Sequence, residues 1–191
     1  ELTGMGRIFT WDPHRPVIAV DIDHTIADTQ RRELIGSTAS DPSTPIPLAA
    51  PTLRELGQRF QILYLTSRPR FLLDKTRHWL RDHGFPEGPV FTAAGLFEMF
   101  GSRAYKQAKL AELRRAWPNL LIGIGDRASD AAAYQANGML AINIGLEPSA
   151  RLSAGTVRLR DWGDVREFFA EHYEHAGLAA LRDGASVKAT R

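Results

Sequence analysis

Four aspartates stand directly after short apolar runs of the chain, as two pairs: Asp21 with Asp23, and Asp126 with Asp130. Carboxylates gathered in a partly desolvated crevice repel one another, so a cluster of this kind needs a cation. Mg²⁺ is the usual ion where carboxylates, waters and a phosphate share one coordination shell. An aspartate can also act as a nucleophile and carry a phosphoryl group. The four residues therefore predict a Mg²⁺ site that serves phosphoryl transfer.

Hydroxyl and cationic side chains supply the remaining groups that phosphoryl transfer needs. Thr66, Ser67 and Arg68 close the second apolar run of the chain, and Lys106 lies in a segment of helical periodicity. Prepositioned donors and cations stabilise the charge on a transferring phosphoryl group. These four residues are therefore candidates for substrate binding. Lys109 competes with Lys106, but three helical residues span about 300°, which is about 60° away from a full turn, and we favour Lys106.

Each of these signals also has a plainer structural explanation. An Asp-x-Asp sequence after a strand is often turn and helix-capping chemistry, and Thr66 alone fits a strand end. Arg68 and Arg127 fit solvent-facing ion pairs equally well. His172 and His175 fit a solvated helix face better than a metal site. The functional interpretation gains its weight because several polar clusters follow several different apolar runs in one chain.

The elements that must position these residues alternate along the chain. Short apolar runs that predict buried strands alternate with segments of helical spacing, which is the pattern of a doubly wound parallel α/β sheet with right-handed crossovers. In such folds ligands bind at the carboxyl ends of the strands. The strands are expected at 17–20, 60–65, 89–92, 120–124, 139–144 and 156–159, and the helices at 51–58, 70–83, 104–116, from just after residue 130 to about 136, and from about 164.

One domain accounts for most of the chain. We expect a leader at 1–16, an α/β domain at 17–175 and a flexible tail at 176–191. Residues 29–50 are rich in Ser, Thr and Pro, and we expect them to form a mobile flap that overhangs the site and governs substrate choice. The domain is therefore expected to be capless, or to carry only this small flap.

Composition excludes several other classes of protein. The 191 residues are 43% hydrophobic and 24% charged, which is typical of a globular domain and not of a disordered chain. The net charge of +2 is too small for nucleic-acid binding by bulk charge, and the absence of cysteine excludes disulfides and thiolate metal sites. No apolar run reaches the ~18 residues of a membrane span. We expect a cytoplasmic protein without a transmembrane segment.

The motifs together resemble those of a known enzyme superfamily. The segment 21–25, Thr66, Lys106 and the segment 125–130 are similar, in order and spacing, to the four motifs of the haloacid dehalogenase superfamily in its phosphatase branch. Within it, the chain resembles the lipin/Nir (LNS2) domain, and the yeast-type actin-patch phosphatidate phosphatases share parts of the pattern. This closer resemblance is carried by residues 64–68, 79–90, 105–106 and 125–134.

The resemblance implies a role for each residue. Asp21 is expected to be the nucleophile, and Asp23 the general acid for the leaving alkoxide and then the base for the hydrolytic water. Thr66 is expected to hydrogen-bond a phosphoryl oxygen, and Lys106 to neutralise the nucleophile and the phosphate. The implied Mg²⁺ ligands are Asp21, the backbone carbonyl of Asp23, Asp126 and, through water or by orienting Lys106, Asp130.

The expected function is Mg²⁺-dependent hydrolysis of a phosphomonoester through an aspartyl-phosphate. The resemblance implies a phosphorylated small molecule or a lipid headgroup, such as that of phosphatidate, as substrate. One alternative is a non-catalytic LNS2-like module that senses phospholipids, but sensors tend to lose the first aspartate and this chain keeps both Asp21 and Asp23. A polynucleotide-end phosphatase is the other alternative, and no basic stripe interleaved with aromatic residues favours it.

Overall fold

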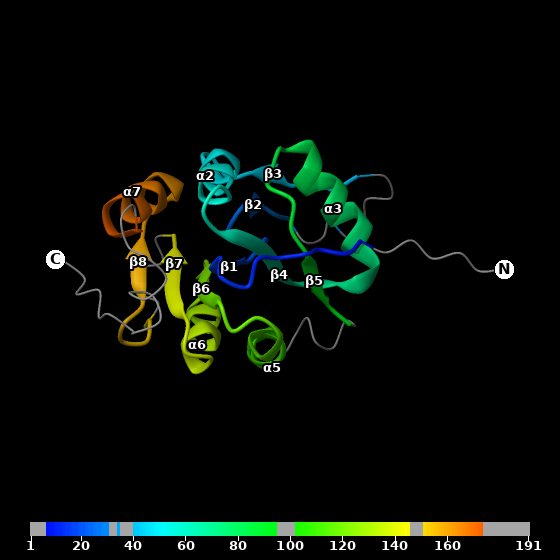
Figure 1. Cartoon of the computed structure of the whole chain (residues 1–191). Helices are drawn as coiled ribbons and strands as arrows, with labels where there is room; N and C mark the ends of the chain where they lie inside the picture. The colour runs from blue at the N-terminus through cyan, green and yellow to red at the C-terminus, as the bar shows by residue number, and fades with distance from the viewer. Residues whose placement is uncertain (1–6, 31–33, 35–39, 95–101, 146–150, 174–191) are drawn as a thin grey trace.

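A six-stranded parallel sheet forms the centre of the computed structural model, which describes residues 7–30, 34, 40–94, 102–145 and 151–173 (Figure 1). Its strands lie in the order β5-β4-β1-β6-β7-β8. Their bounds are β1 Val17–Val20, β4 Gln61–Pro69, β5 Val90–Ala93, β6 Leu120–Gly125, β7 Leu140–Ile144 and β8 Val157–Leu159. The order reverses at β1, because β4 and β5 lie on one side of it and β6, β7 and β8 on the other. This reversal is the place where doubly wound sheets bind ligands.

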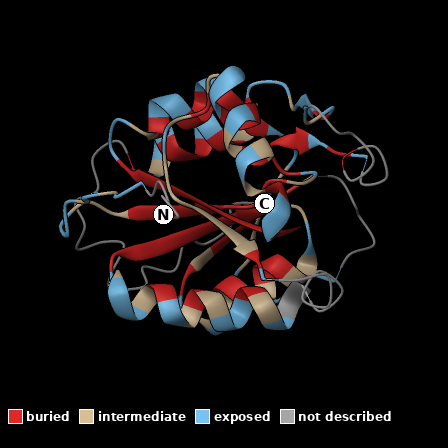
Figure 2. Ribbon diagram, turned by 90° about the vertical axis from the view of Figure 1, so that its right-hand side faces the viewer, coloured by how far each residue is buried: buried red, intermediate tan, exposed pale blue. Residues whose placement is uncertain are grey.

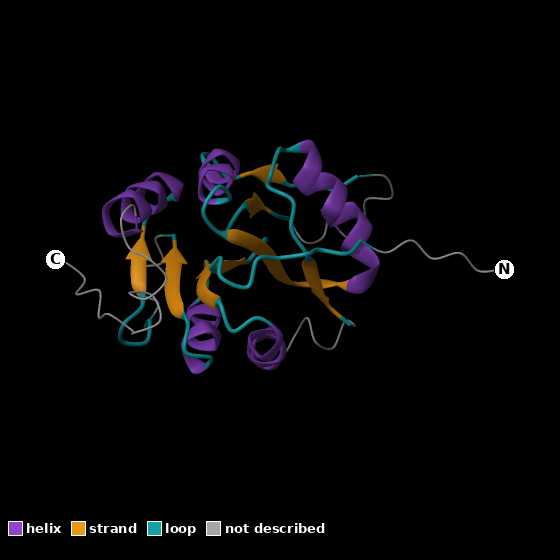
Figure 3. Cartoon of the chain, viewed as in Figure 1, coloured by secondary structure: helices purple, strands orange, loops and turns teal. Residues whose placement is uncertain are grey.

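Helices cover both faces of the sheet (Figures 1 and 3). One face carries α2 (Ala49–Leu56), α3 (Leu73–Asp82) and α7 (Trp162–Tyr173), and the other carries α5 (Ser102–Ala116) and α6 (Ala128–Ala136). Two apolar clusters fill the spaces between sheet and helices. Figure 2 shows the strands as the buried middle layer, with exposed residues on the outer sides of the helices. The predicted doubly wound parallel sheet is confirmed.

Burial on both faces explains why the strand sequences read as continuous apolar runs. All four residues of β1 are buried, and they pair in parallel with β4 and with β6. Val20 lies opposite Tyr64 on one side and Ile124 on the other, so the residues that follow β1 and β6 emerge at the same sheet edge. The fold thereby brings residues 21–23 next to residues 125–126.

Several elements begin or end differently from the sequence prediction. β4 runs on to Pro69 instead of ending at Leu65, so the Thr66–Arg68 segment lies within the strand. Proline is tolerated there because the pairing of β4 with β5 is irregular between Leu65 and Pro69. α7 begins at Trp162 and not near Asp164, because the Asp161 carboxylate accepts hydrogen bonds from the backbone N–H of residues 163 and 164 and caps the helix. A short 3-10 turn, η1 (Arg70–Leu72), precedes α3 where one helix was predicted.

The expected flap at 29–50 is more ordered than its composition predicts. β2 (Ala27–Asp28) and β3 (Thr44–Pro45) pair as an antiparallel ribbon, and α2 begins at Ala49, two residues before the predicted start. Thr29 and Ser43 are buried and share a hydrogen bond of 3.2 Å between their hydroxyls. Residues 31–33 and 35–39 of the flap lie outside the described residues, and its expected mobility stays a prediction.

The expected leader packs against the domain over its described part. The Trp11 ring lies 4.9 Å from the Trp117 ring, centroid to centroid, and the Gln61 side chain donates to the carbonyls of Asp12 and Arg15 at 3.1 and 3.0 Å. Residues 1–6 and the expected tail at 176–191 lie outside the described residues. Within the described part of the chain, no helix is both long and apolar enough to cross a bilayer.

Candidate active site

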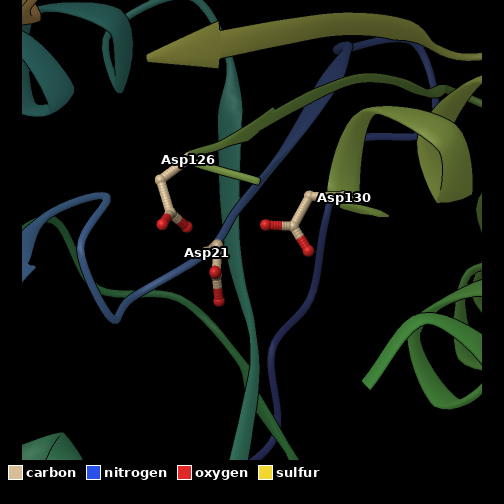
Figure 4. Close-up of side chains that lie close together, drawn as sticks. All are labelled: Asp21, Asp126 and Asp130. Atoms are coloured by element: carbon tan, nitrogen blue, oxygen red, sulfur yellow. The ribbon is translucent and has the colours of Figure 1, made fainter. Parts of the chain in front are cut away.

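Three carboxylates converge at the carboxyl edge of β1 and β6. Asp21, Asp126 and Asp130 each offer an oxygen atom within 4.8 Å of the others, and Figure 4 shows the three side chains facing a common space. Their side chains are 7%, 18% and 3% exposed, so water screens them weakly. These are three of the four aspartates that the sequence singles out as metal ligands.

The local backbone explains how the carboxylates come so close. The Asp21 N–H donates to the Ile124 carbonyl at 2.9 Å, which fixes the start of the loop after β1 against the end of β6. Asp130 lies in the first turn of α6, and its Oδ2 accepts a hydrogen bond from the backbone N–H of Arg127 at 3.3 Å. Gly125 allows this approach, because a Cβ at that position would lie 2.8 Å from the Cβ of Asp130.

Lys106 joins the cluster from α5. Its Nζ lies 2.9 Å from Asp21 Oδ2 and 2.8 Å from Asp130 Oδ1, and its side chain is 3% exposed. Lys109 instead pairs with Glu112 at 2.9 Å on the outer surface, where its side chain is 25% exposed. Of the two lysines that the sequence offers for this role, the structure therefore brings Lys106 to the aspartates.

Burial dominates the electrostatics of the cluster. Burial raises the pKa of Asp21 to about 7; Lys106 opposes this rise, and the neighbouring carboxylates add to it. Burial and Asp130 likewise raise the pKa of Asp126. Burial alone would lower the pKa of Lys106, but the charges of Asp21 and Asp130 outweigh it and raise the pKa of the ammonium. Three carboxylates thus face one ammonium, and this excess of negative charge is what a divalent cation would neutralise.

The oxygen donors of this cluster fit Mg²⁺, and the three aspartates differ in how they are already engaged. Asp130 already uses Oδ1 for Lys106 and Oδ2 for the backbone of Arg127. Asp21 and Asp126 could therefore serve as direct carboxylate ligands of a divalent cation, and Asp130 fits the role of orienting Lys106. Hard oxygen donors of this kind are the ligands that Mg²⁺ prefers where water and a phosphate complete its shell.

Thr66 and Ser67 lie on β4, the strand next to β1. Both are buried, and the Thr66 Oγ1 accepts a hydrogen bond from the backbone N–H of Arg68 at 3.1 Å. The Ser67 Oγ is buried without a hydrogen-bond partner among the described residues. An unsatisfied buried hydroxyl is uncommon, and a phosphoryl oxygen is one partner that could satisfy it.

The contacts of Arg68 differ from the substrate contact that the sequence predicts. Its side chain is 1% exposed, and it forms ion pairs with Asp23 at 2.9 Å and with Asp41 at 2.5 Å. The guanidinium therefore has carboxylate partners within the protein where the sequence predicted a substrate phosphate. Arg127, by contrast, is 46% exposed and lies 3.9 Å from an Asp126 oxygen, at the edge of the site.

Sequence reasoning missed two residues that support the loop after β1. The Thr25 hydroxyl donates to Asp126 Oδ1 at 3.4 Å, and the Trp162 indole donates to the Thr25 carbonyl at 2.8 Å. Trp162 is fully buried and lies 137 residues further along the chain, so no local pattern reveals the contact. Thr25, in contrast, stands in the same short motif as Asp21 and Asp23, which is the signal that could have identified it.

The raised pKa of Asp21 predicts how metal-free stability depends on pH. Between the ordinary pKa of 3.8 and about 7, the folded chain keeps a proton that the unfolded chain has released, so this stabilisation is lost as the pH rises through 7. In EDTA, the melting temperature of wild type relative to Asp21→Asn should therefore fall from about pH 5 to about pH 8. Added Mg²⁺ should raise the wild-type melting temperature more at the higher pH. A pH-independent difference between the two proteins would contradict this assignment.

The fold and the acidic site match the haloacid dehalogenase-like architecture that the sequence motifs resemble. The family model described as "PITM 1-3, LNS2 domain" matches residues 18–144, and the chain belongs to this LNS2 domain family. The resemblance seen in the sequence is thus confirmed.

The chain is also similar to individual proteins in sequence and in structure. The chain is 30% identical over 148 residues to Nuclear elongation and deformation protein 1 of Schizosaccharomyces pombe, a match that covers 68% of this chain. It spans only 23% of that protein's length. Among solved structures, a HAD-superfamily hydrolase from Ehrlichia chaffeensis matches with TM-score 0.58 at 16% identity, covering 82% of this chain and 97% of that one. The 3-deoxy-D-manno-octulosonate 8-phosphate phosphatase of Moraxella catarrhalis, solved with magnesium and phosphate ions, matches with TM-score 0.50 at 18% identity, covering 82% and 84%. At these identities the two structures show the shared fold.

Proposed function

We propose that the chain is a Mg²⁺-dependent phosphomonoester hydrolase that forms an aspartyl-phosphate on Asp21. The observation that carries the proposal is the position of the Asp21 carboxylate, which contacts the Lys106 ammonium at 2.9 Å and faces Asp126. A buried carboxylate held between a cation and a metal-binding group suits nucleophilic attack on phosphorus. Mg²⁺ held by Asp21, Asp126 and the carbonyl of Asp23 would supply positive charge for the phosphoryl oxygens.

In the first step, an oxygen of Asp21 attacks the phosphorus atom and the bond from phosphorus to the ester oxygen breaks. Asp23 gives its proton to the departing oxygen, so that an alcohol leaves and not an alkoxide. Lys106, Thr66 and Ser67 stabilise the phosphoryl oxygens as their charge rearranges. The product of this step is a phosphoryl group bonded to Asp21, with Asp23 ionised.

In the second step, the ionised Asp23 takes a proton from water as the water oxygen attacks phosphorus. The bond between phosphorus and the Asp21 oxygen breaks, inorganic phosphate leaves, and both aspartates return to their starting protonation states. Asp23 lies two residues from Asp21 with its side chain 12% exposed, so it is reachable from solvent while remaining beside the nucleophile.

The substrate that we propose for first testing is a lipid phosphate such as phosphatidate. The support is membership of the LNS2 domain family, together with the small size of the inserted elements. Within the described residues, the insertion between β1 and β4 forms only a two-stranded ribbon and α2, and that between β4 and β5 forms η1 and α3. A site with so little covering structure admits a bulky substrate.

A substrate screen tests the proposed function directly. Phosphatidate in mixed micelles, nucleoside monophosphates, sugar phosphates and p-nitrophenyl phosphate should be incubated with the protein in Mg²⁺ and in EDTA, and phosphate release measured. We expect release in Mg²⁺, its loss in EDTA and its return when Mg²⁺ is restored. Binding of phosphatidate vesicles without hydrolysis of any of these compounds would favour the lipid-sensing alternative instead.

A further inference from the structure

Arg68 occupies the centre of a buried polar cluster beside the site. We name the Arg68 cluster by its five members, which come from four parts of the chain: Arg68, Asp23, Asp41, Thr29 and Thr76. The guanidinium Nε and Nη2 both lie 2.9 Å from Asp23 Oδ1. Nη1 donates to Asp41 Oδ2 at 2.5 Å and to Thr76 Oγ1 at 3.1 Å, and Nη2 donates to Thr29 Oγ1 at 3.2 Å. A nearly fully buried arginine thus holds one carboxylate oxygen of Asp23 in place.

The supports of Arg68 are themselves fixed. The Asp41 side chain is fully buried, and its Oδ1 accepts a hydrogen bond from the backbone N–H of Ser43 at 3.0 Å. The Trp79 indole on α3 donates to the Ser43 carbonyl at 2.7 Å, and the Ser43 hydroxyl donates to Thr29. The guanidinium is therefore hydrogen-bonded to the segment before α2 on one side and to α3 on the other. A group held at this many points has little freedom to follow a moving side chain.

This arrangement matters because of the side chain that it fixes. Asp23 sits on the short loop after β1, where its backbone forms an isolated bridge with Ala27 and its carboxylate pairs with Arg68. Proton transfer to a leaving group requires the donor oxygen within hydrogen-bond reach of the departing oxygen, and small displacements are costly. A planar guanidinium fixes a carboxylate in direction as well as in distance, which a lysine ammonium cannot do.

We propose that Arg68 is a positioning residue for leaving-group protonation, which holds Asp23 in place and is held in turn by Asp41, Thr29 and Thr76. The proposal rests on the hydrolase function proposed above and extends it to the segment between the first two motifs. Arg68 does not bind the phosphate, and it takes no part in the attack by Asp21. Replacing Arg68 should therefore slow the reaction most for substrates whose leaving group most needs a proton.

Phenyl phosphate and p-nitrophenyl phosphate test this, because they differ little in size but strongly in leaving-group quality. Arg68→Lys keeps the positive charge and loses the two-point contact with Asp23. We expect its kcat/KM, which reports the attack step alone, to fall about 10- to 100-fold for phenyl phosphate, which is a part of what general acid catalysis contributes, and by no more than about threefold for p-nitrophenyl phosphate. kcat is not the readout, because Asp23 also acts as the base in the second step, which is the same for both compounds. Arg70→Lys is the matched control, because Arg70 is exposed and two residues away, and it should behave as wild type.

The outcomes separate this inference from the proposed function. Equal losses of kcat/KM on both substrates would overturn the positioning role while leaving the hydrolase intact. A wild-type protein that hydrolyses neither compound in Mg²⁺, nor any compound of the substrate screen, would overturn both. If circular dichroism shows that Arg68→Lys does not fold, the Thr76→Val variant provides the test instead. This substitution removes one hydrogen-bond acceptor of Arg68 and keeps its ion pairs with Asp23 and Asp41. A smaller loss of kcat/KM confined to phenyl phosphate supports the proposal, and an unselective or absent loss overturns it.

Discussion

Replacing Lys106 with methionine should lower kcat by about 10²- to 10³-fold and weaken folding at the same time. The ammonium is the cationic partner of Asp21 and Asp130, at 2.9 and 2.8 Å, in a pocket where all three side chains are buried. Removing one partner of a buried ion pair leaves an uncompensated charge and costs about 3–5 kcal/mol of unfolding free energy. Methionine fills similar space, so the loss reports on charge and not on a cavity.

The pH dependence of this loss has a definite sign. Because Asp21 already has its pKa raised by burial, and loses the opposing effect of Lys106 in the variant, it can take up a proton and relieve the excess negative charge at low pH. The destabilisation should therefore be small below about pH 5 and largest near pH 8, measured by urea denaturation in EDTA. Lys109→Met is the matched control on the same helix, since Lys109 pairs with Glu112 and lies 5.4 Å from the centroid of the Phe91 ring near the surface. Equal effects of the two substitutions would contradict the assignment of Lys106.

The two aspartates after β1 should fail in different ways when each is changed to asparagine. Asp21→Asn removes the nucleophile at almost constant volume, and turnover should fall to background on every substrate. Asp23→Asn leaves attack possible but removes the proton donor of the first step and the base of the second step. General acid or base catalysis contributes about 10²- to 10⁴-fold to the rate of a step. The residual kcat/KM of Asp23→Asn, which reports the attack step alone, should follow leaving-group quality, so p-nitrophenyl phosphate loses less than an alkyl phosphate.

Steady-state rates on an aryl and an alkyl phosphate, measured for both variants, check this pair of expectations. Equal losses on the two substrates in Asp23→Asn would make Asp23 a structural or metal-positioning residue. Activity close to wild type in Asp21→Asn would exclude the covalent mechanism. Melting temperatures in Mg²⁺ serve as the control, because a variant that merely unfolds loses both substrates without selectivity.

The sequence predicts the fold and the acidic site for one physical reason. In a parallel sheet all carboxyl ends share one edge, so polar residues that follow buried strands must meet there. Asp21 and Asp126 follow β1 and β6, which are hydrogen-bonded neighbours, and they come together as expected. Helical periodicity likewise separates Lys106 from Lys109 without any knowledge of the tertiary structure.

The remaining contacts depend on packing that no local pattern encodes. Arg68 and Asp41 are 27 residues apart, and Asp41 lies in a segment without periodicity, so nothing in the sequence indicates that they pair. The extent of β4 depends on the pairing of Pro69 with Ala93 in the neighbouring strand. The start of α7 was predictable, because Asp161 is a favoured N-cap residue.

Trapping the phosphorylated enzyme tests the central claim most directly. Asp23→Asn in Mg²⁺ should be mixed with excess p-nitrophenyl phosphate, quenched in acid within the first turnovers, digested and examined by mass spectrometry, with Asp21→Asn treated in parallel. We expect the peptide containing Asp21 to gain the mass of one phosphoryl group, hydroxylamine to remove it, and the Asp21→Asn peptide to gain nothing. Release of p-nitrophenol in a burst of one equivalent should accompany the label. Continued turnover with an unmodified peptide, or a phosphoryl group on any other residue, would contradict the assignment of Asp21 as the nucleophile.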